Sequence, residues 1–417
     1  MRLTRFSVTG YKNLRVPIVL DELAGVNVIH GENNVGKSNL LQAIDLLFWL
    51  LRRFAHKPPS DVRSADDPSN LAFDVDRDAL VARGFGTDDI FNFDQPLPIV
   101  LEAVVKIDDE DWNRIGRSTD RPAQVSVALV VKPSREGDTR VSVTFDDHQP
   151  RAQPSRLTEE EDADVGGLPT LQEQQTDLRR TVPSHLLLRL YDAKESVEPG
   201  VFQRWEAFER AMNSLGPIVG DGRFVITYNR TQGRALLAVQ KGRTRTPIES
   251  MGSGVQQIAS LLARVLLANS AIVAVEEPEL NLRYELQLRL RDMFREIVES
   301  GLGPTQVILT SHSPAFETSE TFYAMRLTDM GPTVERRPAQ EAVEFLQLPL
   351  GVQMPAEHGA YGYVSSDGLL QLSDDIRATL GVEHGGGVVT LKRHDHPYVE
   401  VLTNEQFMSL MHGGSEG

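Results

Sequence analysis

Short apolar runs recur along the chain and predict β-strands, because a run of roughly four to eight such residues between polar stretches is typical of a buried strand. Residues 1–30 predict two strands around a turn, of which the second ends in the run from Val26 to Ile29. Later runs predict further strands over 97–106, 124–133, 140–146, 223–229, 234–240, 271–277 and 306–310. The last two are apolar until their ends, which is typical of strands buried in a parallel sheet.

Apolar residues at helical spacing predict helices between several of these strands. The helix over 38–53 has a single apolar stripe, and a second such helix opens at the glycine-rich turn that precedes Ile258. Shorter helices are predicted over 169–181, 184–193 and 201–215. No heptad pattern is sustained across 100–245, so a long coiled coil is not expected. Composition predicts a surface loop over 56–72 and a mobile acidic segment over 150–168.

The overall composition is that of an ordinary globular protein. The 417 residues suggest two or three domains. No cysteine is present, which excludes disulfides and thiolate metal sites and is typical of a reducing cytoplasm. Neither an apolar run long enough to span a membrane nor an N-terminal signal peptide is found, so we expect a cytoplasmic protein. The net charge of −16 argues against a general nucleic-acid coat, while a local basic patch is compatible with it.

The candidate chemistry is concentrated between Gly31 and Ser38, which read Gly-x-x-x-x-Gly-Lys-Ser. A buried strand leads into this stretch and an amphipathic helix leaves it, which is the context of a nucleotide-binding P-loop. Backbone N–H groups would converge on phosphate, with a cation from Lys37 and a hydroxyl for Mg²⁺ from Ser38. We therefore expect ATP and Mg²⁺ as cofactors, with an accidental glycine-rich turn as the alternative. The expected nucleotide-binding residues are Gly31, Asn33, Asn34, Gly36, Lys37, Ser38 and Asn39.

Two later strands end in polar side chains that suit ATP hydrolysis. The strand 271–277 ends in Glu276, which would hold Mg²⁺ beside a P-loop, and Glu277, which would act as general base for the attacking water. The alternative is a core strand that ends in two solvated glutamates. The strand 306–310 is followed by His312, which can sense the γ-phosphate from a strand tip. A histidine without a functional role is the alternative there.

A second glycine-rich turn, residues 251–257, opens an apolar helix and so forms another helix N-terminus suited to an anion. Gly252, Ser253 and Gly254 are its candidate nucleotide contacts. The alternative is an ordinary helix start that the Ser253 side chain caps.

These four motifs, in this order, resemble those of ATP-binding-cassette (ABC) ATPases of the RecF/SMC type, and most closely the ATPase module of the overcoming-lysogenization-defect (OLD) family. The resemblance covers the core of residues 1–330. It implies an α/β ATPase head with a mixed sheet, flanking helices and an inserted β/helical subdomain. It also implies that the turn from Gly252 to Gln257 is a signature motif, which contacts ATP bound to a second copy of the chain. The protein would then be a homodimer or a higher oligomer.

The chain departs from the family pattern in several places. Gly252 stands where the signature usually has its leading serine, and residues 281–284 replace a frequent His-x-His-Pro. Gln95 is the candidate for the glutamine that the family places beside the metal, with a plain loop residue as the alternative. OLD nucleases append a metal-dependent nuclease domain, whose Asp-x-Asp pair is not found after His312. This predicts an ATPase without its own nuclease.

The resemblance and the positions of proline and glycine predict how the chain is divided. We expect an ATPase head over 1–345 with an inserted arm over about 97–240, a linker over 346–360, and a small, mostly β module over 361–411 before a tail over 412–417. The small module resembles the AbrB/MazE swapped-hairpin barrel, which implies dimerisation or partner docking. Such a unit is too small to bury much surface alone.

Three functions fit these observations. The leading one is an ATP-hydrolysing molecular switch that closes around ATP and controls a separate effector, such as a nuclease in a genome-defence (anti-phage) system. The second is a RecF-like repair ATPase that acts on DNA directly. The third is a DNA-binding regulator that uses the C-terminal module, with the ATPase as its ligand sensor.

Overall fold

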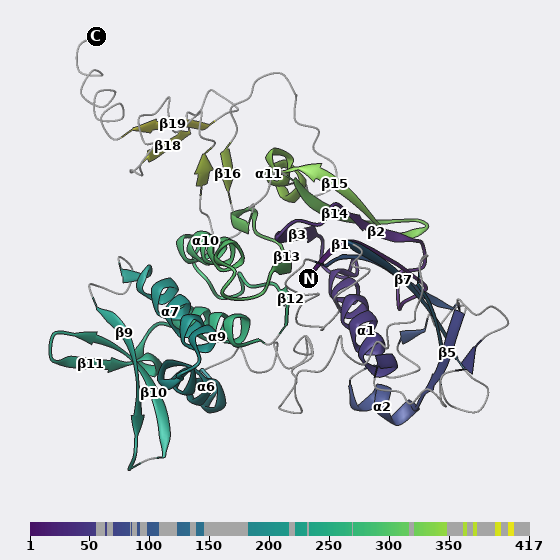
Figure 1. Cartoon of the computed structure of the whole chain (residues 1–417). Coiled ribbons are helices and arrows are strands. Elements are labelled where there is room, and N and C mark those ends of the chain that lie inside the picture. The colour runs from purple at the N-terminus through teal and green to yellow at the C-terminus, as the bar shows by residue number, and fades with distance from the viewer. Residues whose placement is uncertain are drawn as a thin grey trace, which may run out of the picture. The chain divides into compact units, whose positions relative to one another are not determined.

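The structure is a computed structural model. It describes residues 1–55, 63–64, 70–83, 85, 90–91, 98–107, 123–133, 139–145, 182–216, 222–231, 233–268, 270–316, 321–347, 362–364, 370–372, 388–392 and 399–403 (Figure 1). The chain divides into two compact units, Met1–Ala342 and Val343–Gly417. The four sequence motifs all fall in the first unit.

The sheet that carries these motifs has five strands in the order β12–β13–β3–β14–β15. The first four strands run parallel, and β15 is antiparallel to β14. Their bounds are β3 (Val26–Gly31), β12 (Ile272–Glu276), β13 (Gln306–Ser311), β14 (Thr321–Thr328) and β15 (Gly331–Pro338). Every residue of β3, β12 and β13 is buried. This agrees with their nearly continuous apolar sequences, which are typical of parallel strands covered on both faces.

Neighbouring residues of these strands belong to two different hydrophobic cores, because successive side chains of a strand lie on opposite faces of the sheet. In β12, Ile272 lies in one core and Val273 in the other. The first core includes the apolar side of α1 (Lys37–Ala55), and the second includes α9 (Ser253–Leu267) and α10 (Tyr284–Ser300). The parallel sheet is therefore covered by helices on both faces, which sets the P-loop helix and the helix after the glycine-rich turn on opposite sides.

A seven-stranded antiparallel sheet completes the first core, in the order β2–β1–β6–β7–β8–β5–β4. Its strands are β1 (Arg2–Thr9), β2 (Ile18–Asp21), β4 (Arg63–Ser64), β5 (Asn70–Val75), β6 (Ile99–Lys106), β7 (Gln124–Pro133) and β8 (Thr139–Phe145). β6 buries every second residue, which is the period expected of a strand with one face on a core. The short helix α2 (Arg77–Ala82) follows β5 and adds Leu80 to the same core.

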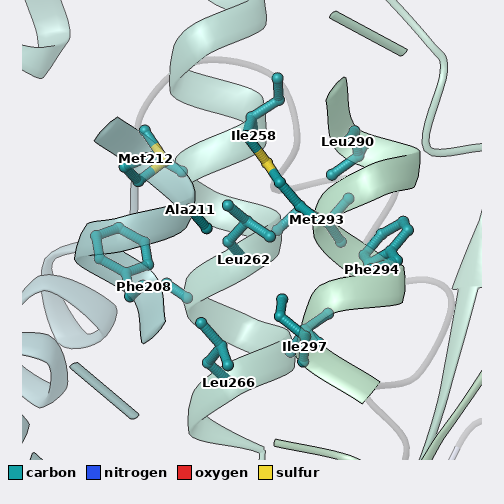
Figure 2. Packing of buried hydrophobic residues seen from close by; sticks show 14 of the residues in the cluster. Phe208, Ala211, Met212, Ile258, Leu262, Leu266, Leu290, Met293, Phe294 and Ile297 are labelled. Atoms are coloured by element: carbon teal, nitrogen blue, oxygen red, sulfur yellow. The ribbon is translucent and has the colours of Figure 1, made fainter. Parts of the chain in front are cut away.

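The second core is built mainly from helices. α6 (Ser184–Glu195) packs on α7 (Pro199–Asn213) and on a three-stranded sheet of β9 (Arg223–Asn229), β10 (Arg234–Lys241) and β11 (Thr244–Pro247). Figure 2 shows how α7, α9 and α10 meet along their apolar faces. The labelled contacts come from Phe208, Ala211, Met212, Ile258, Leu262, Leu266, Leu290, Met293, Phe294 and Ile297.

Short elements complete the description. They are the 3₁₀ turns η3 (Ile248–Ser250), η4 (Pro314–Phe316) and η5 (Ala339–Glu341), and the helix α11 (Ala342–Gln347). In the second unit, two antiparallel pairs are described: β16 (Gly362–Val364) with β17 (Leu370–Leu372), and β18 (Val388–Lys392) with β19 (Val399–Thr403). The predicted division into head, linker and module stays a prediction. Among the helices described, none combines the length and apolar character needed to cross a bilayer.

Most predicted strands and helices are confirmed within a few residues of their ends, but two predictions are wrong. Residues 1–30 hold three strands instead of two, because the short β2 pairs with β1. The loop predicted over 56–72 contains β4 and the start of β5, which pair with each other. Several described elements were not predicted at all, among them β14, β15, α10, α2, β11 and α11. The predicted features that lie outside the described residues include the helix over 169–181, the acidic segment over 150–168, Gln95, most of the linker over 346–360 and the tail over 412–417.

Candidate functional site

Three neighbouring parallel strands bring the sequence motifs together at one edge of the sheet. β3 ends at Gly31, β12 at Glu276 and β13 at Ser311, and Glu276 pairs in register with Thr310. The P-loop therefore follows β3, the carboxylates follow β12, and His312 follows β13. Ligands of open α/β sheets bind outside the carboxyl ends of the strands, which is where these groups lie.

The P-loop is tightly packed and needs glycine at both ends. A Cβ on Gly31 would lie 2.6 Å from the backbone oxygen of Met325, and Gly36 has a φ of +110°. Asn13, in the loop after β1, lies against Gly36, and its side-chain oxygen accepts a hydrogen bond from Asn39 at 2.7 Å. Met325 of β14 and Asn13 of the loop after β1 thus pack against the two glycines of the P-loop.

Two other loop residues singled out from the sequence, Asn33 and Asn34, are exposed. Asn34 has a left-handed backbone with a φ of +63°, a conformation that asparagine tolerates better than most residues. The loop can therefore turn its backbone toward a ligand without a third glycine.

Lys37 is the first residue of α1 and is only 5% exposed. Its Nζ donates hydrogen bonds to the backbone oxygens of Gly31 and Glu32, both at 2.8 Å, and lies 2.9 Å from Nε2 of His312. Burial lowers the pKa of Lys37, and nearby carboxylates, led by that of Glu277, oppose this shift. The ammonium group is thus already desolvated and oriented inside the loop, where it can meet a phosphate oxygen.

The hydroxyl of Ser38 donates a hydrogen bond to a carboxylate oxygen of Glu276, a residue that is 7% exposed. Hydroxyl and carboxylate oxygens suit Mg²⁺, which usually takes its remaining ligands from water and substrate phosphates. Within the described part of the chain, no group of three or more acidic or histidine side chains is arranged to hold a metal ion. The pair therefore fits a Mg²⁺ that arrives with a nucleotide, and does not fit an ion caged by protein alone.

Glu277 follows directly after β12 with a φ of +43°, which is uncommon for a residue other than glycine. Its N–H donates to the carbonyl oxygen of Thr310 at 3.0 Å, which holds it in this conformation. Strained backbone of this kind tends to occur at functional sites that the surrounding structure supports. In this conformation Oε1 of Glu277 lies 3.1 Å from Nε2 of His312.

His312 stands between a cation and a carboxylate, because the same ring nitrogen is close to Lys37 Nζ and to Glu277 Oε1. In one tautomer Nε2 accepts from Lys37, and in the other it donates to Glu277. Burial lowers the pKa of His312, Lys37 lowers it further, and Glu277 opposes both effects. Burial and Lys37 thus favour the neutral imidazole, which can change partner by changing its tautomer.

Glu279 contacts this site although sequence reasoning gave it no role. It is 9% exposed, and its Oε1 accepts the backbone N–H of His312 at 2.5 Å. Burial raises the pKa of Glu279, an effect that this hydrogen bond opposes. The run Glu-Glu-Pro-Glu was visible in the sequence, but nothing in it indicated that the third glutamate turns inward. Asn13 was missed in the same way.

The glycine-rich turn before α9 is exposed at its start and buried at its end. Gly252 and Ser253 are exposed, whereas Gly254 is buried against Leu282 and Leu286. The helix begins at Ser253, with Gly252 in the N-cap position and no side-chain cap. The interpretation of Ser253 as the capping residue is therefore wrong, and its hydroxyl is not used to cap the helix. The first N–H groups of a helix have no partner within the helix, so this exposed start can receive an anion.

The fold is that of an α/β ATPase head of the SMC/ABC type, which confirms the predicted fold class. The chain belongs to the family described as AAA ATPase domain, which matches residues 1–166 and 169–316. The finer resemblance to the OLD family stays a prediction.

Individual proteins that resemble this chain include a repair protein and two SMC heads. The DNA replication and repair protein RecF of Stutzerimonas stutzeri is 38% identical over 73 residues, which are 18% of this chain and 19% of RecF. The match thus spans about a fifth of RecF. An SMC head bound to the C-winged helix domain of ScpA superposes with a TM-score of 0.54 and 15% identity, covering 82% of this chain and all of that one. The SMC head domain from Thermotoga maritima gives a TM-score of 0.47 at 17% identity, covering 81% and 99%.

Proposed function

We propose that this chain is an ATP-hydrolysing molecular switch, two copies of which close on ATP and then control a separate effector protein. The observation that carries the proposal is the convergence of Lys37, the Ser38–Glu276 pair, Glu277 and His312 at one sheet edge. A cation for phosphate, two oxygens for Mg²⁺ and a carboxylate that can orient and deprotonate water are the parts that phosphoryl transfer to water uses.

Each residue has a distinct task in this proposal. Lys37 binds the β- and γ-phosphates, and Ser38 and Glu276 hold Mg²⁺, which neutralises phosphate charge when bound. Glu277 orients the attacking water and accepts its proton, and His312 hydrogen-bonds near the γ-phosphate. The backbone of the loop binds phosphate through the remaining nucleotide-binding residues, Gly31, Asn33, Asn34, Gly36 and Asn39. Gln95 stays a candidate next to the metal.

The second copy of the chain would contribute the turn before α9 to the ATP site. The family resemblance assigns Gly252, Ser253 and Gly254 to ATP bound by a partner subunit, and the exposure of Gly252 and Ser253 supports this for the first two. Gly254 would act through its backbone, because it is buried under Leu282 and Leu286. A dimer built this way has two composite sites, each with the P-loop of one copy and the signature turn of the other.

Ser253→Glu is expected to preserve ATP binding and to abolish hydrolysis, because a carboxylate at this exposed position repels a phosphate that docks there. An acidic residue in the first turn is favourable for the helix itself, so the fold should tolerate it. Mixing this variant with Lys37→Ala protein should restore activity, up to about a quarter of wild type, because half of the dimers are mixed and each then has one intact site. Phosphate release by the two variants, alone and mixed, is the measurement.

Ser253→Gln is the matched control, since it has the same size as the glutamate variant without the charge and should hydrolyse ATP much faster than Ser253→Glu. Gly254 is a poor place for this lesion, because a Cβ there would lie 2.9 Å from Cδ1 of Leu286 and a carboxylate would be buried against apolar side chains. If the mixture stays inactive although tagged copies of the two variants form mixed dimers, the composite-site proposal is wrong.

The effector is proposed from the family resemblance. Genome-defence relatives couple such an ATPase to a separate nuclease, and an anti-phage context is our proposal for this chain as well. The SMC head compared above is bound to a domain of another protein, ScpA, which supports the idea that this fold can carry a partner. The module over 361–411 is proposed to hold two copies together or to dock the effector.

A second candidate function, direct action on nucleic acid, is favoured by the three-stranded sheet β9–β11. Residues 222–247 contain six arginine or lysine residues and no acidic residue, in a chain whose net charge is −16. One of them, Arg223, pairs with Glu209, whereas the hairpin from β10 to β11 exposes Lys241, Arg243 and Arg245. Exposed cations that outnumber local acids are the electrostatic feature that binds a phosphate backbone.

If this sheet binds DNA, Arg243→Ala should weaken the binding of duplex DNA and reduce the slope of log affinity against log salt by about 1. Fluorescence anisotropy of the full-length protein at several salt concentrations measures both quantities. Arg289→Ala, an exposed arginine on α10, is the control and should change neither. Equal affinity and slope for both variants would remove this sheet from consideration.

A further inference from the structure

Residues 277–283 form the tight turn that joins β12 to α10, and we call it the carboxylate turn. It contains two left-handed residues that are not glycine, Glu277 with a φ of +43° and Asn281 with a φ of +61°. Two internal backbone hydrogen bonds close it, from Leu280 N to Glu277 O at 3.2 Å and from Leu282 N to Glu279 O at 2.9 Å. A turn with this geometry has little freedom to move one part without the rest.

Glu279 points into the protein from this turn, at 9% exposure. One carboxylate oxygen, Oε1, accepts the backbone N–H of His312 at 2.5 Å. The other, Oε2, is buried with no hydrogen-bond partner among the described residues, although the Ser311 side chain helps to lower the pKa of this carboxyl group. Burying a carboxylate with an unpaired oxygen costs free energy, so stability alone does not account for a glutamate at this position. The burial that raises the pKa of Glu279 reflects the same cost.

His312 is therefore held twice by the carboxylate turn. Glu279 binds its backbone, and Glu277 Oε1 lies 3.1 Å from its ring at Nε2. The same Nε2 is 2.9 Å from Nζ of Lys37. A displacement of the turn would change where the imidazole lies relative to both the cation and the carboxylate.

The other face of the carboxylate turn contacts the start of α9. The backbone oxygen of Asn281 and the side chain of Leu282 lie against Gly254, within 3.8 and 3.3 Å of where its Cβ would stand. Gln257, the fifth residue of α9, donates a hydrogen bond from Nε2 to the carbonyl oxygen of Pro278 at 3.4 Å. One short turn thus touches both the helix start proposed to meet a partner's ATP and the histidine proposed to meet its own.

We infer that Glu279 is a positioning residue for ATP hydrolysis, which fixes the backbone of His312 so that its imidazole stands between Lys37 and Glu277. Because its turn also contacts α9, Glu279 links the state of the signature turn to the position of this histidine. The inference rests on the proposed function of the site. It gives Glu279 no contact with ATP, so its removal should lower the rate of hydrolysis and leave nucleotide binding intact.

Glu279→Met and Glu279→Gln form the test, in the full-length protein. Methionine has a similar length and removes the acceptor, so kcat should fall about 10-fold, as expected for the loss of a hydrogen bond to a carboxylate, with KM for ATP within about twofold. Glutamine retains an oxygen acceptor and should keep most of the rate. Thermal unfolding of both variants checks the fold, and Glu279→Ala replaces the methionine variant if that one does not fold.

A double-mutant cycle with His312→Ala separates positioning from a general structural role. If Glu279 acts through this histidine, Glu279→Met should have no further effect on kcat once His312 is alanine. Equal loss in both backgrounds, or a glutamine variant as slow as the methionine one, would overturn the inference. If His312→Ala itself hydrolyses ATP at the normal rate, the proposed role of His312 fails first. If His312→Ala is slow and Glu279→Met is normal, only the role of Glu279 is wrong.

Discussion

Lys37→Ala protein is expected to bind ATP at least about 100-fold more weakly than wild type, because it loses a charge-assisted contact to the phosphates. The ammonium group is buried and held by the carbonyl oxygens of Gly31 and Glu32, so binding only has to exchange its contact with His312 for one with a phosphate oxygen. Loss of this preorganised ammonium group should therefore lower the affinity for ATP strongly. Titration calorimetry with ATP and Mg²⁺ measures the affinity.

The fold should survive this substitution. Removing a buried ammonium whose pKa burial lowers also removes a desolvation cost, so the unfolding temperature should change little. Lys194→Ala is the matched control, since that lysine lies on α6 and pairs with Glu195. Undiminished ATP affinity in a folded Lys37→Ala protein would refute the nucleotide-binding assignment of the P-loop.

Glu277→Gln should bind ATP normally and hydrolyse it about 10²–10⁴-fold more slowly, because a neutral amide cannot accept the proton of the attacking water. The amide has nearly the same shape and can still hydrogen-bond to His312, which Glu277 contacts at 3.1 Å. The change should therefore affect chemistry and leave the geometry intact. Single-turnover hydrolysis of radiolabelled ATP, with protein in excess, isolates that step from product release.

Glu285→Gln provides the control for this substitution, as an exposed glutamate in the first turn of α10. It should hydrolyse ATP at the wild-type rate. Normal hydrolysis by Glu277→Gln would show that Glu277 is not the base, and Glu276 would be tested next.

The strands that carry the site were predictable because their own sequences contain the pattern of a buried strand. β3, β12 and β13 are apolar over nearly their whole length, and a strand buried on both faces requires this. β14 has only a short form of this signal, since four residues, Phe322 to Met325, are buried and the last three are exposed. It becomes a strand through parallel pairing with β3, at Tyr323–Ile29 and the next two positions, and such tertiary pairing overrides local propensity.

The convergence of the P-loop with the other motifs was predictable for a similar reason. Phosphate binding depends on neighbouring residues in one loop, so the motif around Lys37 carries its own context. Glu279 and Asn13 act through contacts with residues 33 and 26 positions away in the chain, namely His312 and Asn39. No local pattern contains such contacts, because they exist only after the strands are arranged in order.

Phosphate release from ATP by the purified full-length chain, with Mg²⁺ and beside Lys37→Ala protein prepared in the same way, tests the central claim most directly. The arrangement of Lys37, Ser38, Glu276 and Glu277 predicts that the wild-type chain releases phosphate in a Mg²⁺-dependent reaction that Lys37→Ala protein lacks. Phosphate release that is equal in the two proteins, whether absent from both or present in both, would contradict it.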